Sequence, residues 1–482
     1  MGDRLRSADV RFLLPAWPAR VRVAGLDAHV ARALVTAGHE VVADHAQADA
    51  ALCTTGTLRE VLRDGPLPCG VVVQGTGSGP LRALARAGLQ GRGWLLLAGD
   101  GGPSVAVPAR SEQASRAALL AYAGRQDLTK AVRNRLAHRA LVAGLLPPRQ
   151  WTAAVSEAAD GASWPAVSGC AGDPGPAFLA FPGRDALSRV VAVLPAGRVV
   201  KLTRLPHADD SATADLAGML LAAGSPVARL HAPRSLGHGR LASPQGGPAL
   251  PWTAETLGVG ESLTAHLQTR GGDRIALLKA IARWLRDLAL STTGPAGSLR
   301  PLLDRLHQES DAVSGEIPFR LDSTEELATV LSHDDLGCWN VVTDGKDWTV
   351  LDWEGARAAG LPLADLLYLL TDALGQRDGA RSDDERLSHA LRLHRGELPA
   401  SALLFALVRE HALALRIPIA AVPTLALACW LWHGRGTKQR LATARAAGIE
   451  IAVPLPPAAQ LGRAWLLDPE LRSTWEAFSR TC

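Results

Sequence analysis

The sequence predicts a multidomain protein in which an N-terminal α/β domain precedes an α+β domain with a mainly helical C-terminal part. The chain has 482 residues, which suggests two to three domains. Residues 1–150 alternate short apolar runs with amphipathic stretches, and such repeats favour a doubly wound parallel sheet. Helical patterns dominate after Leu363. Together these features predict an α/β unit followed by a more helical one.

The composition excludes several classes of protein. Hydrophobic residues make up 47% of the chain, and 51 basic residues nearly balance 47 acidic ones. This balance argues against a dedicated nucleic-acid surface. The six cysteines form no C-x-x-C pair, so neither a disulfide scaffold nor a zinc site is indicated. We expect a protein that buries large apolar cores without such cross-links.

No membrane segment is expected. The N-terminus shows no signal peptide. The most apolar late stretch, Ile417–Trp432, has 16 residues and holds two prolines, whereas a membrane span needs about 20 apolar residues. A buried helix is the better interpretation of this stretch, and a cytoplasmic location is expected.

The first strands and helix of the N-terminal domain follow a known order. Arg20–Gly25 and residues 40–44 are predicted to be strands, with a helix over Ala28–Gly38 between them. This order resembles the start of a Rossmann-like methyltransferase domain, in which Asp44 would be the acid at the end of the second strand. A working fingerprint has G-x-G after the first strand, but here Gly25 stands alone. We therefore favour a degenerate scaffold or docking module over a second active site.

The first domain is expected to end near residue 150. A helical pattern covers Leu128–Leu146 and stops at Pro147-Pro148. A β-rich pair of segments follows, Ser188–Leu194 and Arg198–Thr203, joined by a Pro-Ala-Gly turn signal. The second of these segments carries Lys201. This pattern predicts a β-hairpin.

Residues 333–354 carry the strongest functional signal. His333, Asp335 and Asn340 form an H-x-D-x-x-x-x-N pattern, and Asp352 follows a short apolar strand twelve residues later. Phosphoryl transfer needs a carboxylate to orient the attacking hydroxyl and accept its proton, and oxygen ligands for Mg²⁺. Asp335 suits the first task, and Asn340 with Asp352 suits the second. The alternative is that Asp335 and Asn340 are turn residues and Asp352 caps a helix.

The flanking residues resemble the aminoglycoside phosphotransferase and choline kinase group, which has a kinase-like fold. Its catalytic loop runs roughly HGDLHPGN, and its metal aspartate lies in a segment that Leu351–Glu354 matches. The stretch Pro362–Leu367 is similar to the P-x-x-D-L stretch that follows in the family. The sequence departs at Asp334, where the family usually has glycine. The base is therefore placed at Asp335, and Asp334 is given no role.

The resemblance also implies roles for residues outside the loop. Lys201 would contact the nucleotide phosphates and be held by an acid on the next helix, for which Asp215 is the candidate. Ser188 or Arg189, at the end of the loop before the hairpin, would reach phosphate. His333 would brace the catalytic loop.

The implied domains are an N-terminal Rossmann-like domain (1–150), a kinase-like small lobe (151–260) and a large lobe with the catalytic loop and acceptor helices (261–482). ATP or GTP would bind in the cleft between the lobes together with Mg²⁺. The acceptor would be a hydroxyl of a small molecule: a metabolite, a sugar or glycan precursor, or an aminoglycoside-like compound. The oligomeric state is left open.

Two other functions compete with this kinase. One is a catalytically silent pseudokinase that binds nucleotide in a regulatory or scaffold role. The other is a methyltransferase with a helper lobe, which the missing G-x-G disfavours. The kinase hypothesis requires Asp335, Asn340 and Asp352 to converge around one cation that faces Lys201.

Overall fold

The computed structural model describes residues 9–480 except for 64, 66, 77, 100–101, 113–138, 141, 144, 146–150, 163, 173–174, 182–186, 195–196, 207–208, 243–245, 270–272, 307–325 and 447–456. The chain forms two compact units. The first consists chiefly of the chain up to Leu216 and of Ser235–Leu257. The second consists chiefly of Ala217–Arg234, Gly258–Gly448 and Val453–Cys482. The helix predicted over Leu128–Leu146 lies largely outside the described residues.

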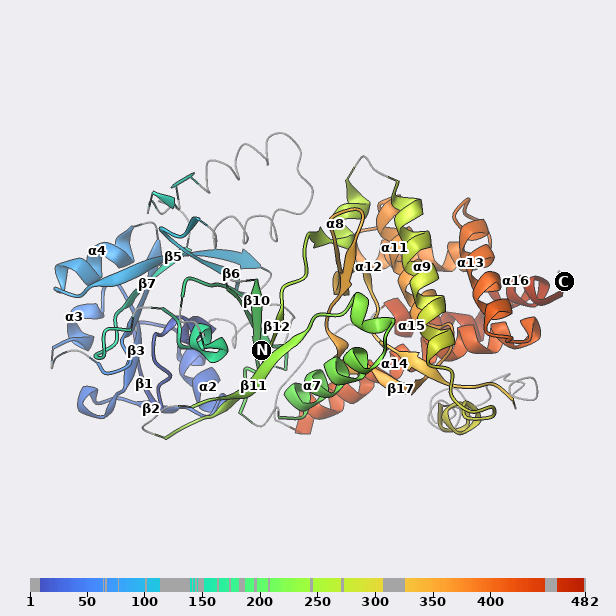
Figure 1. Ribbon diagram of the computed structural model, residues 1–482. Helices are drawn as coiled ribbons and strands as arrows, with labels where there is room; N and C mark the ends of the chain where they lie inside the picture. Colours follow the sequence, from blue (N-terminus) through green and yellow to red (C-terminus); the bar gives the residue numbers. More distant parts are fainter. Residues whose placement is uncertain are drawn as a thin grey trace. The chain divides into compact units, whose positions relative to one another are not determined.

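Within the described residues, the first unit is built on one mixed sheet of twelve strands. Its parallel part has the order β2-β1-β3-β4, of which β2, β1 and β3 are labelled in Figure 1. The elements of this part are β1 (Arg20–Ala24), α2 (Ala28–Thr36), β2 (Glu40–Val42), β3 (Ala50–Thr54), α3 (Leu58–Val61), β4 (Val71–Thr76) and α4 (Gly79–Arg86). The βα order predicted for the start of the chain is therefore present.

Helices cover both faces of the parallel strands because side chains alternate along a strand. On one face, Val21 and Leu52 form a buried cluster with Leu34 of α2. On the other, neighbouring strand residues pack with Leu58 of α3 and Leu84 of α4. Helix α2 begins where Asp27 accepts a hydrogen bond from the backbone N–H of His29, which satisfies one of the unpaired donors at the helix start.

The rest of the sheet is antiparallel, which corrects the expectation of a parallel sheet over residues 1–150. Strand β5 runs antiparallel to both of its neighbours. From β4 onward the order is β7-β5-β6-β8-β9-β10-β12-β11. These strands are β5 (Gly91–Gly99), β6 (Gly102–Pro108), β7 (Trp151–Ser156), β8 (Phe178–Ala180), β9 (Val190–Leu194), β10 (Arg198–Leu202), β11 (Ser235–Leu241) and β12 (Leu250–Thr256).

Two features of this sheet matter for the site. The predicted hairpin is present as β9 and β10, and Lys201 lies opposite Val191 on one side and Thr253 of β12 on the other. Strand β7 begins at Trp151 and lies between β4 and β5, so hydrogen-bonded pairing continues across the boundary expected near residue 150. The division into three domains stays a prediction.

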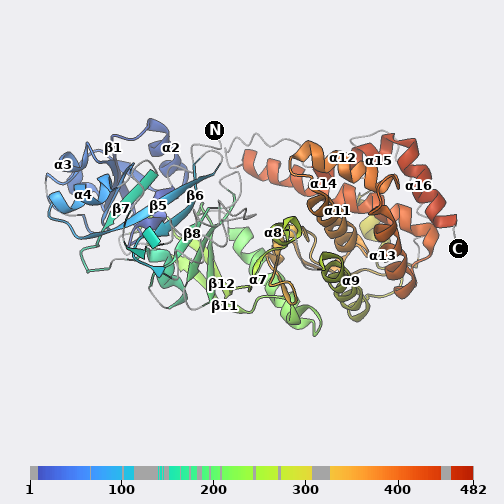
Figure 2. The ribbon, with the colours of Figure 1, turned by 90° about the horizontal axis from the view of Figure 1, so that it is seen from above.

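The second unit is mainly helical, as predicted for the C-terminal part. Its central helix, α11, packs against α9, α13 and α14 (Figure 2). The helices are the last part of α7 (Asp209–Gly224), α8 (Leu263–Gln268), α9 (Arg274–Ser291), α11 (Ala364–Asp378), α12 (Asp383–His394), α13 (Ser401–Ala414), α14 (Val422–Ala446), α15 (Pro457–Leu467) and α16 (Pro469–Arg480).

Short strands hold the catalytic segment on this helical body. Strand β14 (Val330–Ser332) pairs with β17 (Arg357–Gly360), and β15 (Val341–Thr343) pairs with β13 (Glu261–Ser262) and β16 (Trp348–Val350). The residues between β14 and β15 form the loop that contains the predicted motif.

The apolar stretch Ile417–Trp432 is a buried part of the helical core, as predicted. It leads into α14, and Leu425, Cys429 and Trp430 belong to the main buried cluster of the second unit. Among the described residues, no helix has the length and apolar character needed to cross a membrane.

Candidate active site

The catalytic loop is closed by a short network between Asp335 and Asn340. The side-chain Nδ2 of Asn340 donates to the backbone oxygen of Asp335 at 2.8 Å and to its Oδ2 at 3.1 Å. Asn340 is buried and lies at the end of a 3₁₀ turn, Cys338–Asn340. Because the amide nitrogen makes these hydrogen bonds, the amide oxygen of Asn340 is the atom that can coordinate a cation.

His333 joins the loop to the strand end that carries Asp352. Its Nε2 lies 2.8 Å from the backbone oxygen of Leu351, and its Nδ1 accepts the backbone N–H of Asp335 at 3.3 Å. A carbonyl can only accept, so Nε2 carries the proton and the imidazole is neutral. The ring also meets Trp353 edge-on, with centroids 4.9 Å apart. These contacts suit the bracing role predicted for His333.

Asp365 anchors the beginning of the loop from helix α11. Its carboxylate accepts the backbone N–H groups of His333 at 2.7 Å and Asp334 at 3.0 Å. Burial, and next the charge of Asp334, raises the pKa of Asp365 to about 7. Asp365 belongs to the P-L-A-D stretch noted in the sequence, but no role was predicted for it.

Asp335 lies in a strongly acidic environment. Burial raises the pKa of Asp335 to about 7, and the nearby carboxylates of Asp352 and Glu354 add to the rise. Hydrogen bonds from Trp339 and Asn340 act in the opposite direction. Asp335 and Asp352 therefore lie close enough to interact, as the kinase hypothesis requires of them. The contribution of Glu354 was not predicted.

Two donors near Asp335 were missed by sequence reasoning. Trp339 and Tyr368 interact electrostatically with the Asp335 carboxylate, and their rings meet edge-on with centroids 5.9 Å apart. Trp339 nevertheless remains 45% exposed. No sequence signal linked Tyr368 to the loop, because it comes from α11. These rings form an aromatic wall beside the candidate base.

Asp334 has a structural role that the sequence did not reveal. Its φ is 64°, a left-handed conformation that glycine adopts easily and aspartate tolerates better than most residues. This explains why glycine suits the position in the resembling family. The Asp334 carboxylate pairs with Arg357 at 2.8 Å, and accepts from Trp432 Nε1 at 3.2 Å and from the hydroxyl of Ser332. Asp334 thus ties the loop to β17 and α14.

The residues proposed to hold Mg²⁺ have suitable chemistry. Asn340 offers an amide oxygen, and the carboxylates of Asp335 and Asp352 lie near each other. Hard cations prefer such oxygens, and Mg²⁺ usually takes only one or two carboxylates from a protein. Within the described part of the chain, no three His, Cys, Asp or Glu side chains are grouped as a metal site. The amide oxygen and the carboxylates fit a hard cation whose remaining ligands would be phosphate and water.

Among the described residues, Lys201 of the first unit lies in a buried cluster of charged side chains. Its Nζ donates to Asp215 Oδ1 at 3.3 Å and pairs with Glu255 Oε2 at 3.0 Å. Arg189 Nη1 lies 3.0 Å from the same Asp215 oxygen. The expected contact between Lys201 and Asp215 is present, but Glu255 and Arg189 were not predicted as members. Glu255 could not be found from the sequence, since its position depends on the pairing of β10 with β12.

A hydrogen bond to its backbone carbonyl holds Ser188 in place. Its carbonyl oxygen accepts from Arg204 Nη1, and Arg204 is in turn bound to Asp9 at 3.0 Å. Residues 183–186 of the loop expected to cover phosphate lie outside the described residues. The phosphate-binding role of Ser188 stays a prediction.

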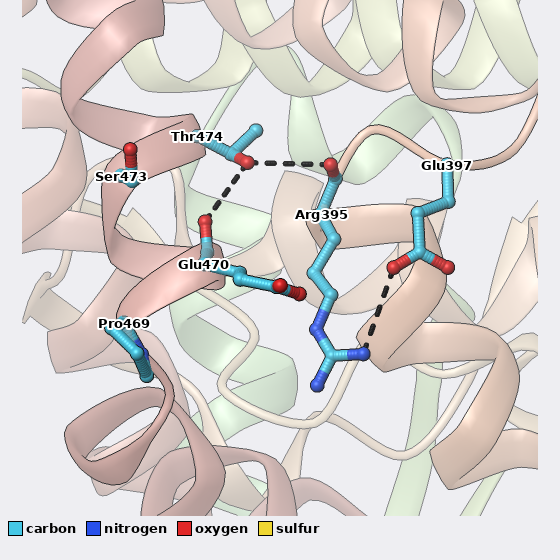
Figure 3. Close-up of a pocket in the computed structure, with 6 residues that line it drawn as sticks. All are labelled: Arg395, Glu397, Pro469, Glu470, Ser473 and Thr474. Atoms are coloured by element: carbon cyan, nitrogen blue, oxygen red, sulfur yellow. Dashed lines mark hydrogen bonds and ion pairs between the residues drawn. The ribbon is translucent and has the colours of Figure 1, made fainter.

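A concavity of about 490 Å³ lies at the start of α16 (Figure 3). It is lined by Arg395, Glu397, Pro469, Glu470, Ser473 and Thr474. Thr474 bonds to the backbone oxygens of Arg395 and Glu470, and Arg395 pairs with Glu397. The lining contains no residue of the predicted site, and its one arginine faces two glutamates.

The middle of the chain matches a known family. Residues 179–403 match the model of the phosphotransferase enzyme family. This segment runs from β8 to α13 and contains both Lys201 and the catalytic loop. The resemblance predicted from the catalytic segment is confirmed. No curated protein matches the chain.

The similarity of this chain to solved structures is weaker. A choline/ethanolamine kinase family protein from Mesorhizobium loti is 15% identical over 65% of this chain and 98% of its own, with a TM-score of 0.34. The GDP and kanamycin complex of APH(2")-IIia is 14% identical over 60% and 93%, with a TM-score of 0.33. A glucosamine kinase is 15% identical over 67% and 87%, with a TM-score of 0.31. Such values carry no argument about the substrate of this chain.

Proposed function

We propose that this protein is a Mg²⁺-dependent kinase that transfers the γ-phosphate of ATP or GTP to a hydroxyl of a small molecule. The observation that carries the proposal is the catalytic loop, in which His333, Asn340 and Asp365 hold Asp335 in one conformation. A preorganised carboxylate of this kind is what an in-line transfer needs to align its nucleophile.

Asp335 has the role of base. Its carboxylate would accept a hydrogen bond from the acceptor hydroxyl and then its proton as the new phosphate ester forms. A pKa of about 7 suits a group that must take up a proton near neutral pH. Asn340 donates a hydrogen bond to Asp335 and limits its rotation, and Trp339 and Tyr368 interact electrostatically with the same carboxylate.

Asn340 and Asp352 would hold Mg²⁺, which when bound offsets charge on the phosphates. Lys201 would bind the phosphates, with Asp215 as an acidic partner and Ser188 in the adjoining loop. Lys201 and the catalytic loop belong to different units, so their joint action on one nucleotide is part of the proposal. The acceptor remains one of the classes named from the sequence: a metabolite, a sugar or glycan precursor, or an aminoglycoside-like compound.

We also propose that the N-terminal strands form a Rossmann-like scaffold without a working cofactor site. A Cβ added to Gly25, after β1, would lie 2.7 Å from Thr54 Oγ1 and 2.9 Å from Thr57 Oγ1. Thr57 Oγ1 also donates to the backbone oxygen of Ala24 at 3.0 Å. Side chains therefore occupy the place where a cofactor would approach the backbone. S-adenosylmethionine is expected to cause no thermal shift in the protein, and a saturable shift would contradict this part of the proposal.

The kinase proposal is tested with the full chain and an Asp335→Asn variant. We expect Mg·ATP or Mg·GTP to raise the melting temperature of both proteins. Only the wild type should transfer labelled phosphate to members of a hydroxyl-compound panel, because the variant loses about 10³-fold in rate. Asp347→Asn, an exposed change in the turn between β15 and β16, is the control and should retain transfer.

The outcomes separate the competing functions. Nucleotide binding without transfer or hydrolysis by the wild type would favour the pseudokinase. Undiminished transfer by Asp335→Asn would refute the role of Asp335.

A further inference from the structure

An indole ring beside the candidate base is open to solvent. Trp339 lies in the catalytic loop between Asp335 and Asn340 and is 45% exposed. Among the described residues, the other large apolar side chains that are exposed are all aliphatic. An exposed indole offers a ligand a large, rigid surface with an electron-rich face. Its place next to the candidate base gives this surface a bearing on the acceptor.

The Trp339 ring is held from two sides. A Cβ added to Gly337 would lie 2.4 Å from two atoms of the ring, so the backbone of Gly337 lies directly against it. The ring of Tyr368 meets it edge-on, with centroids 5.9 Å apart. Tyr368 in turn stacks on His433, with centroids 3.7 Å apart and an interplanar angle of 11°. Trp339 is therefore a preformed surface, which a ligand need not order on binding.

Backbone hydrogen bonds fix the position of Trp339 relative to the base. The N–H of Gly337 donates to the backbone oxygen of Asp335 at 2.9 Å, and Nδ2 of Asn340 donates to the same oxygen at 2.8 Å. These two bonds enclose Trp339 in one short turn with Asp335. An acceptor that places a hydroxyl at the Asp335 carboxylate therefore brings its neighbouring atoms close to the indole.

The rings beside the base favour a flat neutral ligand over an ammonium ion. A cation is bound best where aromatic faces surround it, but the ring of Tyr368 is already stacked on His433. A single open indole instead suits the C–H groups on one side of a saccharide ring, because their partial positive charges face the electron-rich ring.

Several carboxylates of this region already have a role or a partner. Asp335 and Asp352 act as base and cation ligand in the proposed function. Asp334 pairs with Arg357 at 2.8 Å, and Asp372 accepts a backbone N–H of the loop at 2.9 Å. An ammonium group would draw on such carboxylates as counter-charges, whereas a neutral saccharide needs none.

We propose that Trp339 is a specificity-determining residue that stacks against the ring of a neutral saccharide acceptor and places one of its hydroxyls at Asp335. The hydroxyl oxygen then bonds to the γ-phosphorus of the nucleotide, the bond from that phosphorus to the leaving diphosphate breaks, and the hydroxyl proton passes to Asp335. This inference rests on the proposed function, because it assumes a kinase with Asp335 as base. It narrows the proposed acceptors to saccharides.

The test measures phosphate transfer by the full chain from Mg·ATP and Mg·GTP to neutral mono- and disaccharides, including glucose and maltose, and to choline and kanamycin as cationic probes. We expect a neutral saccharide to be the best acceptor. Trp339→Ala should raise the KM for that saccharide about tenfold or more, because the stacking surface is lost, and should leave nucleotide affinity unchanged. Leu413→Ala, at a 60% exposed position on α13, is the matched control and should keep the wild-type KM.

A second variant, Trp339→Phe, separates stacking from an effect through Asp335. Phenylalanine keeps a flat ring but lacks the indole N–H, so its KM should stay within about threefold of the wild type. A phenylalanine variant as weak as the alanine variant would show that Trp339 acts through Asp335 and would overturn the inference. If Trp339→Ala does not fold, Trp339→Leu, which has no ring, takes its place.

The remaining outcomes separate this inference from the proposed function. An unchanged KM in Trp339→Ala, or better transfer to choline or kanamycin than to any neutral saccharide, would overturn the role of Trp339 and leave the kinase proposal standing. Absence of transfer to every probe would instead refute the proposed function.

Discussion

Asp365 accepts the backbone N–H of His333 at 2.7 Å and thereby fixes the start of the catalytic loop to helix α11. The same carboxylate accepts the next N–H, that of Asp334, at 3.0 Å. One buried side chain therefore satisfies two consecutive backbone donors where the chain leaves β14. Because buried donors are costly when unsatisfied, the loop conformation depends on this residue.

Replacement of Asp365 should destabilise the second unit. Asp365→Ala leaves two backbone donors without their partner, and we expect the free energy of unfolding to fall by about 2–4 kcal/mol. Asp365→Asn keeps one acceptor oxygen and should lose less. Urea denaturation of the purified proteins gives both values. An alanine variant as stable as the wild type would show that water replaces the carboxylate.

The left-handed conformation of Asp334 can be tested with two small residues. Both Asp334→Gly and Asp334→Ala remove the contacts to Arg357 and Trp432. Only alanine also carries the steric penalty of a positive φ, so the alanine variant should be less stable than the glycine variant by about 1 kcal/mol. Chemical denaturation measures the difference. Equal stabilities would indicate that the loop relaxes out of this conformation.

Gly218 permits a close approach between α7 and the residue after Asp352. A Cβ at Gly218 would lie 1.7 Å from the backbone oxygen of Trp353, so Gly218→Ala must displace one of the two backbones. We expect the variant to lose about 3 kcal/mol or more of stability.

Gly224, at the end of the same helix, is the matched control for this change. A Cβ there would meet no atom within 4 Å. Gly224→Ala should leave stability unchanged or raise it by up to about 1 kcal/mol. Thermal denaturation of both variants provides the comparison, and similar losses at the two positions would argue against the close contact.

His394 should make stability depend on pH. Burial lowers the pKa of His394 from its ordinary value of 6.5 to about 3, and the ring lies among Trp430, Trp465 and Trp475. Below pH 6.5 the side chain of His394 becomes protonated in the unfolded chain but stays neutral in the folded protein. The contribution of His394 is therefore present above pH 6.5 and is lost as pH falls toward 3.

The loss amounts to about 2 kcal/mol by pH 5. We expect His394→Phe to reduce the dependence of unfolding free energy on pH by this amount between pH 7.5 and 5. Urea denaturation across that range measures it. An unchanged slope would mean that the imidazole can be protonated in the folded protein.

Local patterns were sufficient to predict several elements. The hairpin of β9 and β10 followed from two β-rich runs around a turn signal, and the buried start of α14 followed from the apolar stretch Ile417–Trp432. The parallel start of the sheet also followed from the order of strands and helices. The direction and order of β5 to β8 could not be predicted, because they depend on pairing between strands far apart in the chain.

The candidate site likewise contains features that the sequence predicts and features that depend on the fold. The sequence by itself predicted Asp335, Asn340 and Asp352 as candidate site residues, because their spacing within one loop and one strand end can be read directly from the chain. Only the tertiary structure decided that Asp334 would meet Trp432 and that Arg189 and Glu255 would surround Lys201. Those contacts join segments brought together by strand pairing and core packing, and buried charges can be matched only once the fold has placed them side by side.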